Sequence, residues 1–283
     1  MLFFAMKTPH RFSFSAVVVA VVMACAFSAP CLAAIGGPTS KLYVSDLKGK
    51  ADLNTRDAIT PLSKKAVFDA QGSTILTANE SNDSMVYSNG TGIYLDGNTR
   101  LSVKKFIQEP FTPNRYDLET EPSVSQTEAH LSYGVIGLCT SRLAAGSNMV
   151  YTTPQAIIDI RGNKIVIEVG NYETRVSVLD GDVTIHAASG DAGEILHGGQ
   201  EAIIRADATD HSTIVHAGPI PDDRKKFLDD RVSLACIAKR TVYFEVVNRP
   251  GPNGEETQDI QAAAVVPADK PVDFTVSPSA LKQ

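Results

Sequence analysis

The chain has 283 residues, of which 43% are hydrophobic and 20% are charged, and it contains no Trp. This is the composition of a globular protein that is long enough to bury a core. Its 26 basic side chains are outnumbered by 32 acidic ones and form no long cluster. That argues against nucleic-acid binding, which depends on clustered Lys and Arg.

The first 33 residues are predicted to be a secretory signal peptide. A short basic stretch precedes an apolar run over 12–27, and residues 31–33 (CLA) offer a small-x-Ala cleavage site. The run is shorter than the about 20 residues that cross a bilayer. Two alternatives stay open, an uncleaved N-terminal anchor and a lipoprotein signal modified at Cys25. Either of them would tether the protein to a membrane.

From Lys41 to about Ala206 the sequence predicts many short β-strands. Apolar and polar residues alternate in short runs, most clearly over 84–88, 92–96, 164–169, 175–179, 182–186 and 201–205. Turn residues such as Asn89-Gly90 and Asp180-Gly181 close the runs, because tight hairpin turns require positive φ. We therefore expect an all-β fold, an antiparallel or solenoid-like β roll or a sandwich, without crossover helices.

The segments around these strands have other patterns. Residues 109–128 contain three prolines and no alternation, which predicts a surface loop between two β blocks. Within an extension over 207–247, near-helical spacing of apolar residues predicts one short helix at 221–232, and 241–247 predicts a last strand that could join the sheet. The Pro- and Ala-rich composition of 248–283 predicts a flexible, disordered tail.

The sequence predicts no catalytic, cofactor-binding or metal site. It lacks the G-x-S-x-G, H-E-x-x-H and GK[ST] motifs and, after the leader, any C-x-x-C pair. The carboxylate pairs at 222–223 and 229–230 are interpreted as a helix surface. Scattered surface positions are expected for the histidines His130, His186, His197, His211 and His216. Ordinary strand positions are expected for the tyrosines Tyr87, Tyr94, Tyr151 and Tyr172.

Cys139 and Cys236 are the two cysteines that follow the leader. In an oxidising compartment outside the cytoplasm they could form a disulfide. The alternative is two buried free thiols, because each lies among Leu, Ile and Ala.

Short motifs follow one another in a fixed order between residues 72 and 200. They are 72–78 (GSTILTA), 80–90 (ESNDSMVYSNG), 95–101 (LDGNTRL), 106–111 (FIQEPF), 131–137 (LSYGVIG), 152–156 (TTPQA), 160–162 (IRG), 178–183 (VLDGDV) and 196–200 (LHGGQ). This series resembles the FecR regulatory domain, a β-rich module on the outer side of bacterial inner membranes. Ala78 and Asn163 depart from the residues usual in that family.

The resemblance implies an extracytoplasmic β module, solenoid-like in its regulatory relatives, that binds another protein. The chain shows neither the cytoplasmic anti-sigma segment nor the membrane span of the family's namesake regulators, so transmembrane signalling is not implied. We expect a signal peptide over 1–33, a FecR-like domain over 41–206, an extension over 207–247 and a tail over 248–283.

The expected function is that of an exported, non-enzymatic scaffold or sensor, periplasmic or secreted, with an envelope or secreted protein as its partner. No cofactor and no nucleic acid are expected, and membrane contact only if the leader is retained or lipidated. Two other classes remain as alternatives. They are a cell-wall or polysaccharide-binding module and a hydrolase with an unfamiliar site.

Overall fold

The structure, a computed structural model, describes residues 41–112, 117–188, 193–206, 212–250 and 256–264. These residues form nineteen strands and one helix, so the predicted all-β class with a single helix is confirmed. The first strands are β1 (Lys41–Lys48), β2 (Ala51–Asn54), β3 (Ile59–Pro61), β4 (Val67–Asp69), β5 (Thr74–Thr77), β6 (Asn82–Tyr87), β7 (Gly92–Leu95), β8 (Arg100–Gln108) and β9 (Ser125–Cys139). The later elements are β10 (Asn148–Thr152), β11 (Ala156–Ile160), β12 (Lys164–Val169), β13 (Glu173–Asp180), β14 (Asp182–Ala187), β15 (Glu194–His197), β16 (Gln200–Ala206), β17 (Ser212–Pro219), α1 (Asp222–Lys239), β18 (Val242–Pro250) and β19 (Glu256–Ala264).

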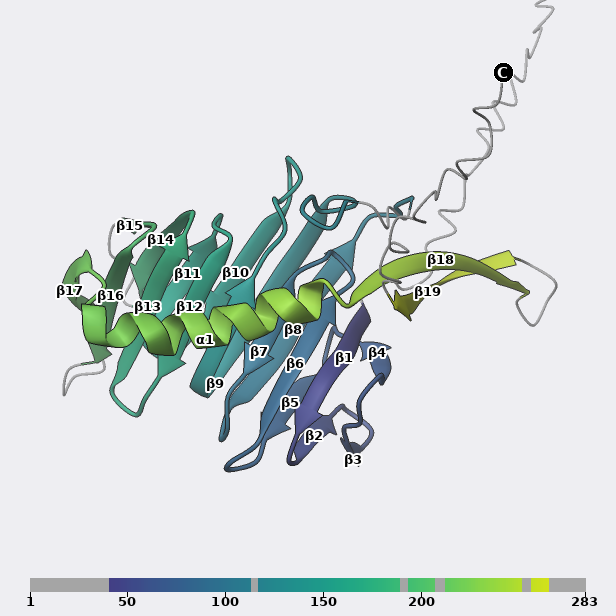
Figure 1. The fold of residues 1–283 in the computed structure, drawn as a ribbon, viewed down its shortest axis with the longest axis horizontal. Helices are drawn as coiled ribbons and strands as arrows, with labels where there is room; N and C mark the ends of the chain where they lie inside the picture. The colour runs from purple at the N-terminus through teal and green to yellow at the C-terminus, as the bar shows by residue number, and fades with distance from the viewer. Residues whose placement is uncertain (1–40, 113–116, 189–192, 207–211, 251–255, 265–283) are drawn as a thin grey trace, which may run out of the picture. The chain divides into compact units, whose positions relative to one another are not determined.

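Seventeen of the strands form one hydrogen-bonded network that folds into two facing layers (Figure 1). The first layer, here called the helix-side sheet, has the order β4-β1-β6-β7-β9-β12-β13-β16-β17. The second, the open-side sheet, has the order β3-β2-β5-β8-β9-β10-β11-β14-β15. Strand β9 belongs to both layers, with its first part pairing with β8 and β10 and its last part with β7 and β12.

Alternation along the strands places one apolar row between the two layers. In β11, Ala156, Ile158 and Ile160 are buried while the residues between them are exposed or half-buried. The same period of two recurs along the other strands, and together the inward side chains form one contiguous core. At its centre the rings of Tyr87 and Phe106 meet edge to face, with their centroids 5.1 Å apart.

Most of the strand pairing is antiparallel, as the hairpin turns predict. Gly90 and Gly181 have φ of 86° and 90°, the left-handed conformation that their Asn-Gly and Asp-Gly turns require. The exception is a parallel pair, in which β10 runs beside the first part of β9. Because β9 already begins at Ser125, the loop predicted over 109–128 is too long by its last four residues.

The C-terminal part of the chain differs most from expectation. The helix is not short, because α1 has 18 residues and continues to Lys239. A strand that the sequence did not predict, β17, joins the edge of the helix-side sheet. The predicted last strand exists as β18, but it pairs with β19 in a separate two-stranded sheet. Strand β19 also corrects the prediction of a disordered tail from residue 248 onward, while 265–283 lie outside the described residues.

In the part of the chain that the structure describes, no helix combines the length and apolar character needed to cross a membrane. The predicted signal peptide over 1–33 lies outside these residues.

Candidate functional site

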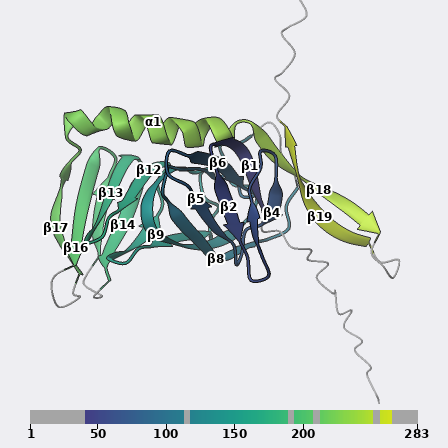
Figure 2. The ribbon, with the colours of Figure 1, turned by 90° about the horizontal axis from the view of Figure 1, so that it is seen from below.

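Helix α1 lies flat on the outer surface of the helix-side sheet (Figure 2). Two glycines on adjacent strands make this close approach possible. A Cβ atom at Gly92 would lie 2.1 Å from the carbonyl oxygen of Ala235, and one at Gly137 would lie 2.8 Å from that of Arg231. Both distances are too short for a real side chain, so these positions require glycine for packing.

Three basic side chains on α1 reach carboxylates of the sheet and its loops. Arg231 Nη2 is 2.5 Å from Asp96 Oδ2, and Lys239 Nζ is 3.0 Å from Glu119 Oε2. Arg224 pairs with both Glu168 and Glu201. The guanidinium of Arg231 also lies 3.4 Å from the ring centroid of Phe227, a cation–π contact. These contacts fix the helix in one register along the sheet.

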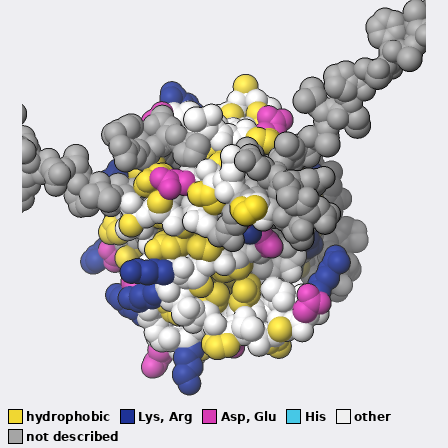
Figure 3. All heavy atoms as spheres, turned by 90° about the vertical axis from the view of Figure 1, so that its right-hand side faces the viewer, with side chains coloured by type: hydrophobic (Ala, Val, Ile, Leu, Met, Phe, Trp, Pro, Cys, Tyr) yellow, Lys and Arg dark blue, Asp and Glu magenta, His cyan; other side chains and the backbone are white. Residues whose placement is uncertain are grey.

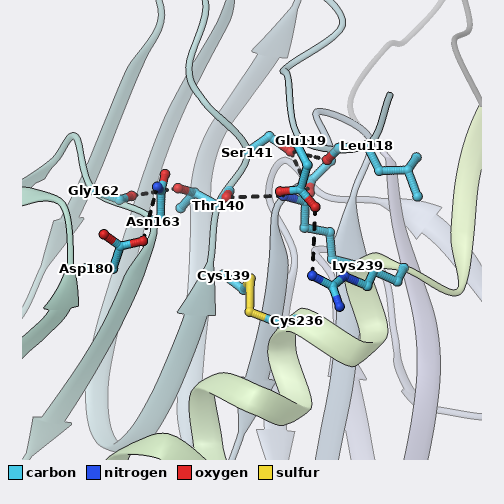
Figure 4. Close-up of a disulfide and its surroundings, with 12 residues drawn as sticks. Leu118, Glu119, Cys139, Thr140, Ser141, Gly162, Asn163, Asp180, Cys236 and Lys239 are labelled. Carbon is cyan, nitrogen blue, oxygen red and sulfur yellow. Dashed lines mark hydrogen bonds and ion pairs between the residues drawn. A yellow bond between two sulfur atoms is a disulfide. The ribbon is translucent and has the colours of Figure 1, made fainter. Parts of the chain in front are cut away.

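A disulfide joins the helix to β9 near the C-terminal end of α1 (Figure 4). The Sγ atoms of Cys139 and Cys236 are 2.06 Å apart, and the bridge links residues 97 positions apart in the sequence. Beside it lies a polar hollow of about 430 Å³ whose rim carries the exposed side chains of Arg142, Lys164 and Arg240. The disulfide therefore borders a hydrophilic surface hollow and does not lie in the core between the two layers.

A second hollow, here called the junction cleft, lies where α1 ends and β18 begins. It encloses about 260 Å³. Its lining consists of Ser88, Gly90, Phe111, Thr112, Asp117, Leu118, Thr120, Glu121, Pro122, Lys239, Val242, Tyr243 and Phe244. These residues come from three separate parts of the sequence. Figure 3, which looks at the β18–β19 end of the described chain, shows apolar side chains in the middle of this face, with Lys and Arg mostly toward its border.

Buried polar groups hold one wall of the junction cleft in place. The carboxylate of Glu121 accepts hydrogen bonds from the Asn89 side-chain amide at 3.2 Å, the Ala144 backbone N–H at 2.8 Å and the Ser147 hydroxyl at 2.5 Å. The Ser125 hydroxyl donates a fourth. Because these four partners lie in three segments, around residues 89, 125 and 144–147, this one buried side chain fixes the loop around residue 121 against three neighbours.

Lys239 lies between the two hollows and lines both. Its side chain is only 2% exposed, and its ammonium group also donates to the carbonyl oxygen of Thr140 at 3.3 Å. The ion pair with Glu119 and this hydrogen bond offset the cost of burying a charged amine. The C-terminal end of α1 is thus tied to β9 by the disulfide and to the loop over 117–122 by Lys239.

A buried carboxylate in the core has no counterpart among the sequence predictions. The side chain of Asp83 in β6 is fully buried, and no described residue forms an ion pair with it. Burial raises the pKa of Asp83 to about 7, and the nearby negative charge of Asp46 adds to this effect. The sequence pattern that could have revealed it is an acidic residue at an inward position of a strand, in the same alternating row as Met85 and Tyr87.

The structure places the histidines apart from one another. His197 Nδ1 lies 2.7 Å from Asp182, His186 lies 3.7 Å from Asp159, and His130 hydrogen-bonds Thr152 at 2.9 Å. His211 lies outside the described residues. No group of three or more His, Cys, Asp or Glu side chains that could hold a metal ion occurs within the described ranges.

Of the four tyrosines expected at ordinary strand positions, three lie in strands and Tyr172 does not. Tyr87 and Tyr151 are fully buried, and Tyr94 is 5% exposed beneath the helix. Tyr172, at the turn between β12 and β13, is 76% exposed. A flat platform of several aromatic rings is therefore not formed by these residues.

Comparison with known proteins connects this fold to one family. Residues 73–184 match the family model described as FecR protein. Two crystal structures of candidate anti-sigma factors from Parabacteroides distasonis are also similar, with 14% and 17% identity and TM-scores of 0.40 and 0.39. Each match covers 54% of this chain and 62% of the other chain, so the chain spans less than two thirds of their length. A comparison with curated proteins finds no match. The chain thus contains a region, residues 73–184, that matches the FecR family, and this region lies within the two facing β layers.

Proposed function

We propose that this protein is an exported, non-catalytic module that binds a protein partner in the cell envelope, and that the junction cleft is its binding site. The match to a regulatory family supports a sensor or scaffold role. The observation that carries the proposal is the junction cleft itself. It combines an apolar lining with polar groups, and a disulfide and buried hydrogen bonds make it rigid.

Export follows from the leader-like sequence of the first 33 residues and agrees with the paired cysteines. A disulfide between residues far apart in sequence is typical of proteins from oxidising compartments. Intact-mass analysis of protein from fractionated cells tests this part. A periplasmic or secreted species beginning at Ala34 and lacking two hydrogens supports it. A full-length or lipid-bearing species in the membrane fraction would instead indicate a tethered protein.

Crosslinking in living cells followed by mass spectrometry tests the partner. Phe111→Ala should remove an apolar wall of the cleft and reduce partner capture, while the matched control Tyr172→Ala should not, because Tyr172 lies outside the cleft. Equal loss in both variants, or capture unaffected by either, would exclude the cleft as the binding site. Binding to a glycan array that depends on Tyr172 would favour the polysaccharide alternative.

A further inference from the structure

The polar hollow beside the disulfide carries more positive than negative charge. Its charged lining consists of the basic side chains Arg142, Lys164, Lys239 and Arg240 and the acidic side chains Glu119 and Asp180. Four basic minus two acidic groups leave an excess of two positive charges. The whole chain has a net charge of −6, so this excess is local and opposite in sign to the charge of the protein.

Glu119 is neutralised within the hollow. Its carboxylate lies 3.0 Å from Lys239 Nζ and 4.0 Å from Arg240 Nη2. The C-terminal end of α1 also borders the hollow, and the partial negative charge of a helix C-terminus opposes an anion. Lys239 in the last turn and Arg240 at the C-cap offset this partial charge. The helix side of the hollow therefore does not exclude an anion.

Lys164 and Arg142 are the two cations of the hollow that are available to a ligand. Both side chains are exposed, and no carboxylate of the described chain lies within ion-pair distance of either. Arg142 donates one hydrogen bond to the Thr120 hydroxyl at 3.1 Å, and its charge also acts on Asp117, which is exposed and does not line the hollow. A guanidinium has five N–H donors, so this bond leaves others for an oxyanion.

The strand register fixes Lys164 beside the disulfide. Lys164 begins β12 and is the cross-strand partner of Cys139 in β9. Paired residues direct their side chains to the same face of a sheet, so the Lys164 side chain and the disulfide both lie on the helix side. Cys139 is in turn bonded to Cys236 of α1. The floor of the hollow is therefore rigid, which lowers the entropic cost of binding a ligand.

The volume and charge of the hollow match a small ligand with a doubly charged oxyanion. Its volume of about 430 Å³ lies within the about 300–1,000 Å³ typical of small-molecule sites. A phosphate monoester carries about −1.5 to −2 charges at pH 7, which is close to the local excess of positive charge, whereas a single carboxylate carries one negative charge. Arg binds phosphate oxygens as a planar fork and Lys binds them as a point charge.

We propose that the polar hollow beside the disulfide binds a phosphate monoester, with Lys164 and Arg142 contacting the phosphate oxygens. Such a group belongs either to a small soluble ester or to the headgroup of a lipid, and both offer the same chemistry to the site. The assignment adds a second site to the junction cleft proposed above. It does not depend on a protein partner.

Calorimetric titration of the purified, oxidised protein with glycerol phosphate tests the role of Lys164. Lys164→Met removes the charge and keeps an apolar stem, and the Kd should rise about tenfold, as expected for the loss of one charge-assisted hydrogen bond. The matched control Lys50→Met removes an exposed lysine that does not line the hollow, and it should leave the Kd unchanged. Equal weakening in both variants overturns the proposal.

A change of the opposite sign supplies a second readout. Asp180→Asn removes a carboxylate that repels the phosphate and keeps the size of the side chain, and Asn before Gly181 suits the same tight turn. The Kd for glycerol phosphate should fall about threefold because one opposing charge is lost. An unchanged or raised Kd contradicts the proposed position of the phosphate.

Two further probes identify the source and the charge of the bound group. Sedimentation with vesicles that contain phosphatidic acid tests a lipid headgroup, and binding that Lys164→Met weakens would assign the phosphate to a membrane surface. Binding of glycerol phosphate without binding to vesicles would assign it to a soluble ester. Acetate at the same ionic strength is the control for charge, and acetate binding as tight as that of glycerol phosphate overturns the proposal. The absence of Lys164-dependent binding with both phosphate probes overturns it as well.

Discussion

The two outer faces of the β layers differ in what covers them and therefore in what their side chains must do. On the helix-side sheet, α1 rests on Gly92 and Gly137 and is held by a disulfide and three basic side chains. On the open-side sheet, no described helix covers the outer surface. One cross-strand row there consists of Ser102, His130, Thr152, Ile157 and His186. We therefore expect substitutions to cost more stability on the covered face, which depends on close packing, than on the open face.

Among changes to the covered face, removal of the disulfide should lower the free energy of unfolding the most. In the chain-entropy model, a bridge across 97 residues contributes about 4.7 kcal/mol to the free energy of unfolding. The double variant Cys139→Ser/Cys236→Ser should lose a large part of this, which urea unfolding measures. A reducing agent should destabilise the wild type and leave the double variant unchanged. Equal stability of oxidised wild type and double variant would show that the bridge adds nothing.

The next largest effect on the free energy of unfolding is expected from the buried carboxylate of Asp83, which lies in the interior between the two faces. An unfolded Asp ionises near pH 4, while the pKa of Asp83 in the folded protein is raised to about 7. The folded state therefore resists ionisation, and its stability falls as the pH rises from about 4 to 7, then stays level.

Asp83→Asn removes this titration. At pH 8 it should raise the free energy of unfolding by up to about 4 kcal/mol, less the cost of a buried amide. Urea unfolding of both proteins at pH 4.5 and pH 8 measures the difference, whose charge-dependent part should fall to about 1 kcal/mol at the lower pH. A gain of the same size at both pH values would assign the effect to packing and not to charge.

A branched side chain at Gly92 should disturb the covered face specifically. Because a Cβ there would meet the Ala235 carbonyl oxygen, Gly92→Val should cost about 3 kcal/mol by overpacking or displace α1. Ile157→Val on the open face, at a side chain that is 39% exposed, is the control and should stay within about 0.5 kcal/mol. Thermal unfolding compares them, and near-wild-type stability of Gly92→Val would mean that the helix does not rest on this strand.

The smallest effect is expected from one of the helix ion pairs. Arg231→Met keeps an apolar stem but removes the pair with Asp96 and the contact with Phe227, at a cost of about 1 kcal/mol. The control Lys226→Met removes an exposed pair with Asp230 on the same helix and should be nearly neutral. Urea midpoints measure both. A larger loss from the control would assign the stabilisation to surface charge instead of to docking on the sheet.

Strands with strict alternation were predictable from local sequence, and those defined by their partners were not. The run 182–186 corresponds to β14 to within one residue, because its more buried and more exposed positions follow the period of two. Strand β19 contains Gln261 and three alanines, which favour no extended structure by themselves, and it exists by pairing with β18. Likewise the apolar residues from Leu234 to Ala238 are continuous, so they gave no helical period that would extend the predicted helix to Lys239.

The candidate site was only partly visible in the sequence. The two cysteines were recognised as a possible pair, but the position of the bridge on the outer surface of a sheet depends on α1, whose docking follows from glycines on two separate strands. The junction cleft combines residues near 90, 111–122 and 239–244. No local pattern brings these segments together, and so sequence reasoning missed Glu121 and Lys239.

The passage of β9 from one layer to the other affects how the domain can come apart. Its fifteen residues turn at Gly134, where φ is 99°, and pair with β8 and β10 before this point and with β7 and β12 after it. A force or a local opening that strips β9 from one layer therefore pulls directly on the other. The most protected amide hydrogens of the two layers should therefore exchange with solvent at similar rates. The two layers would then open as a single foldon, in which mechanical load passes through β9.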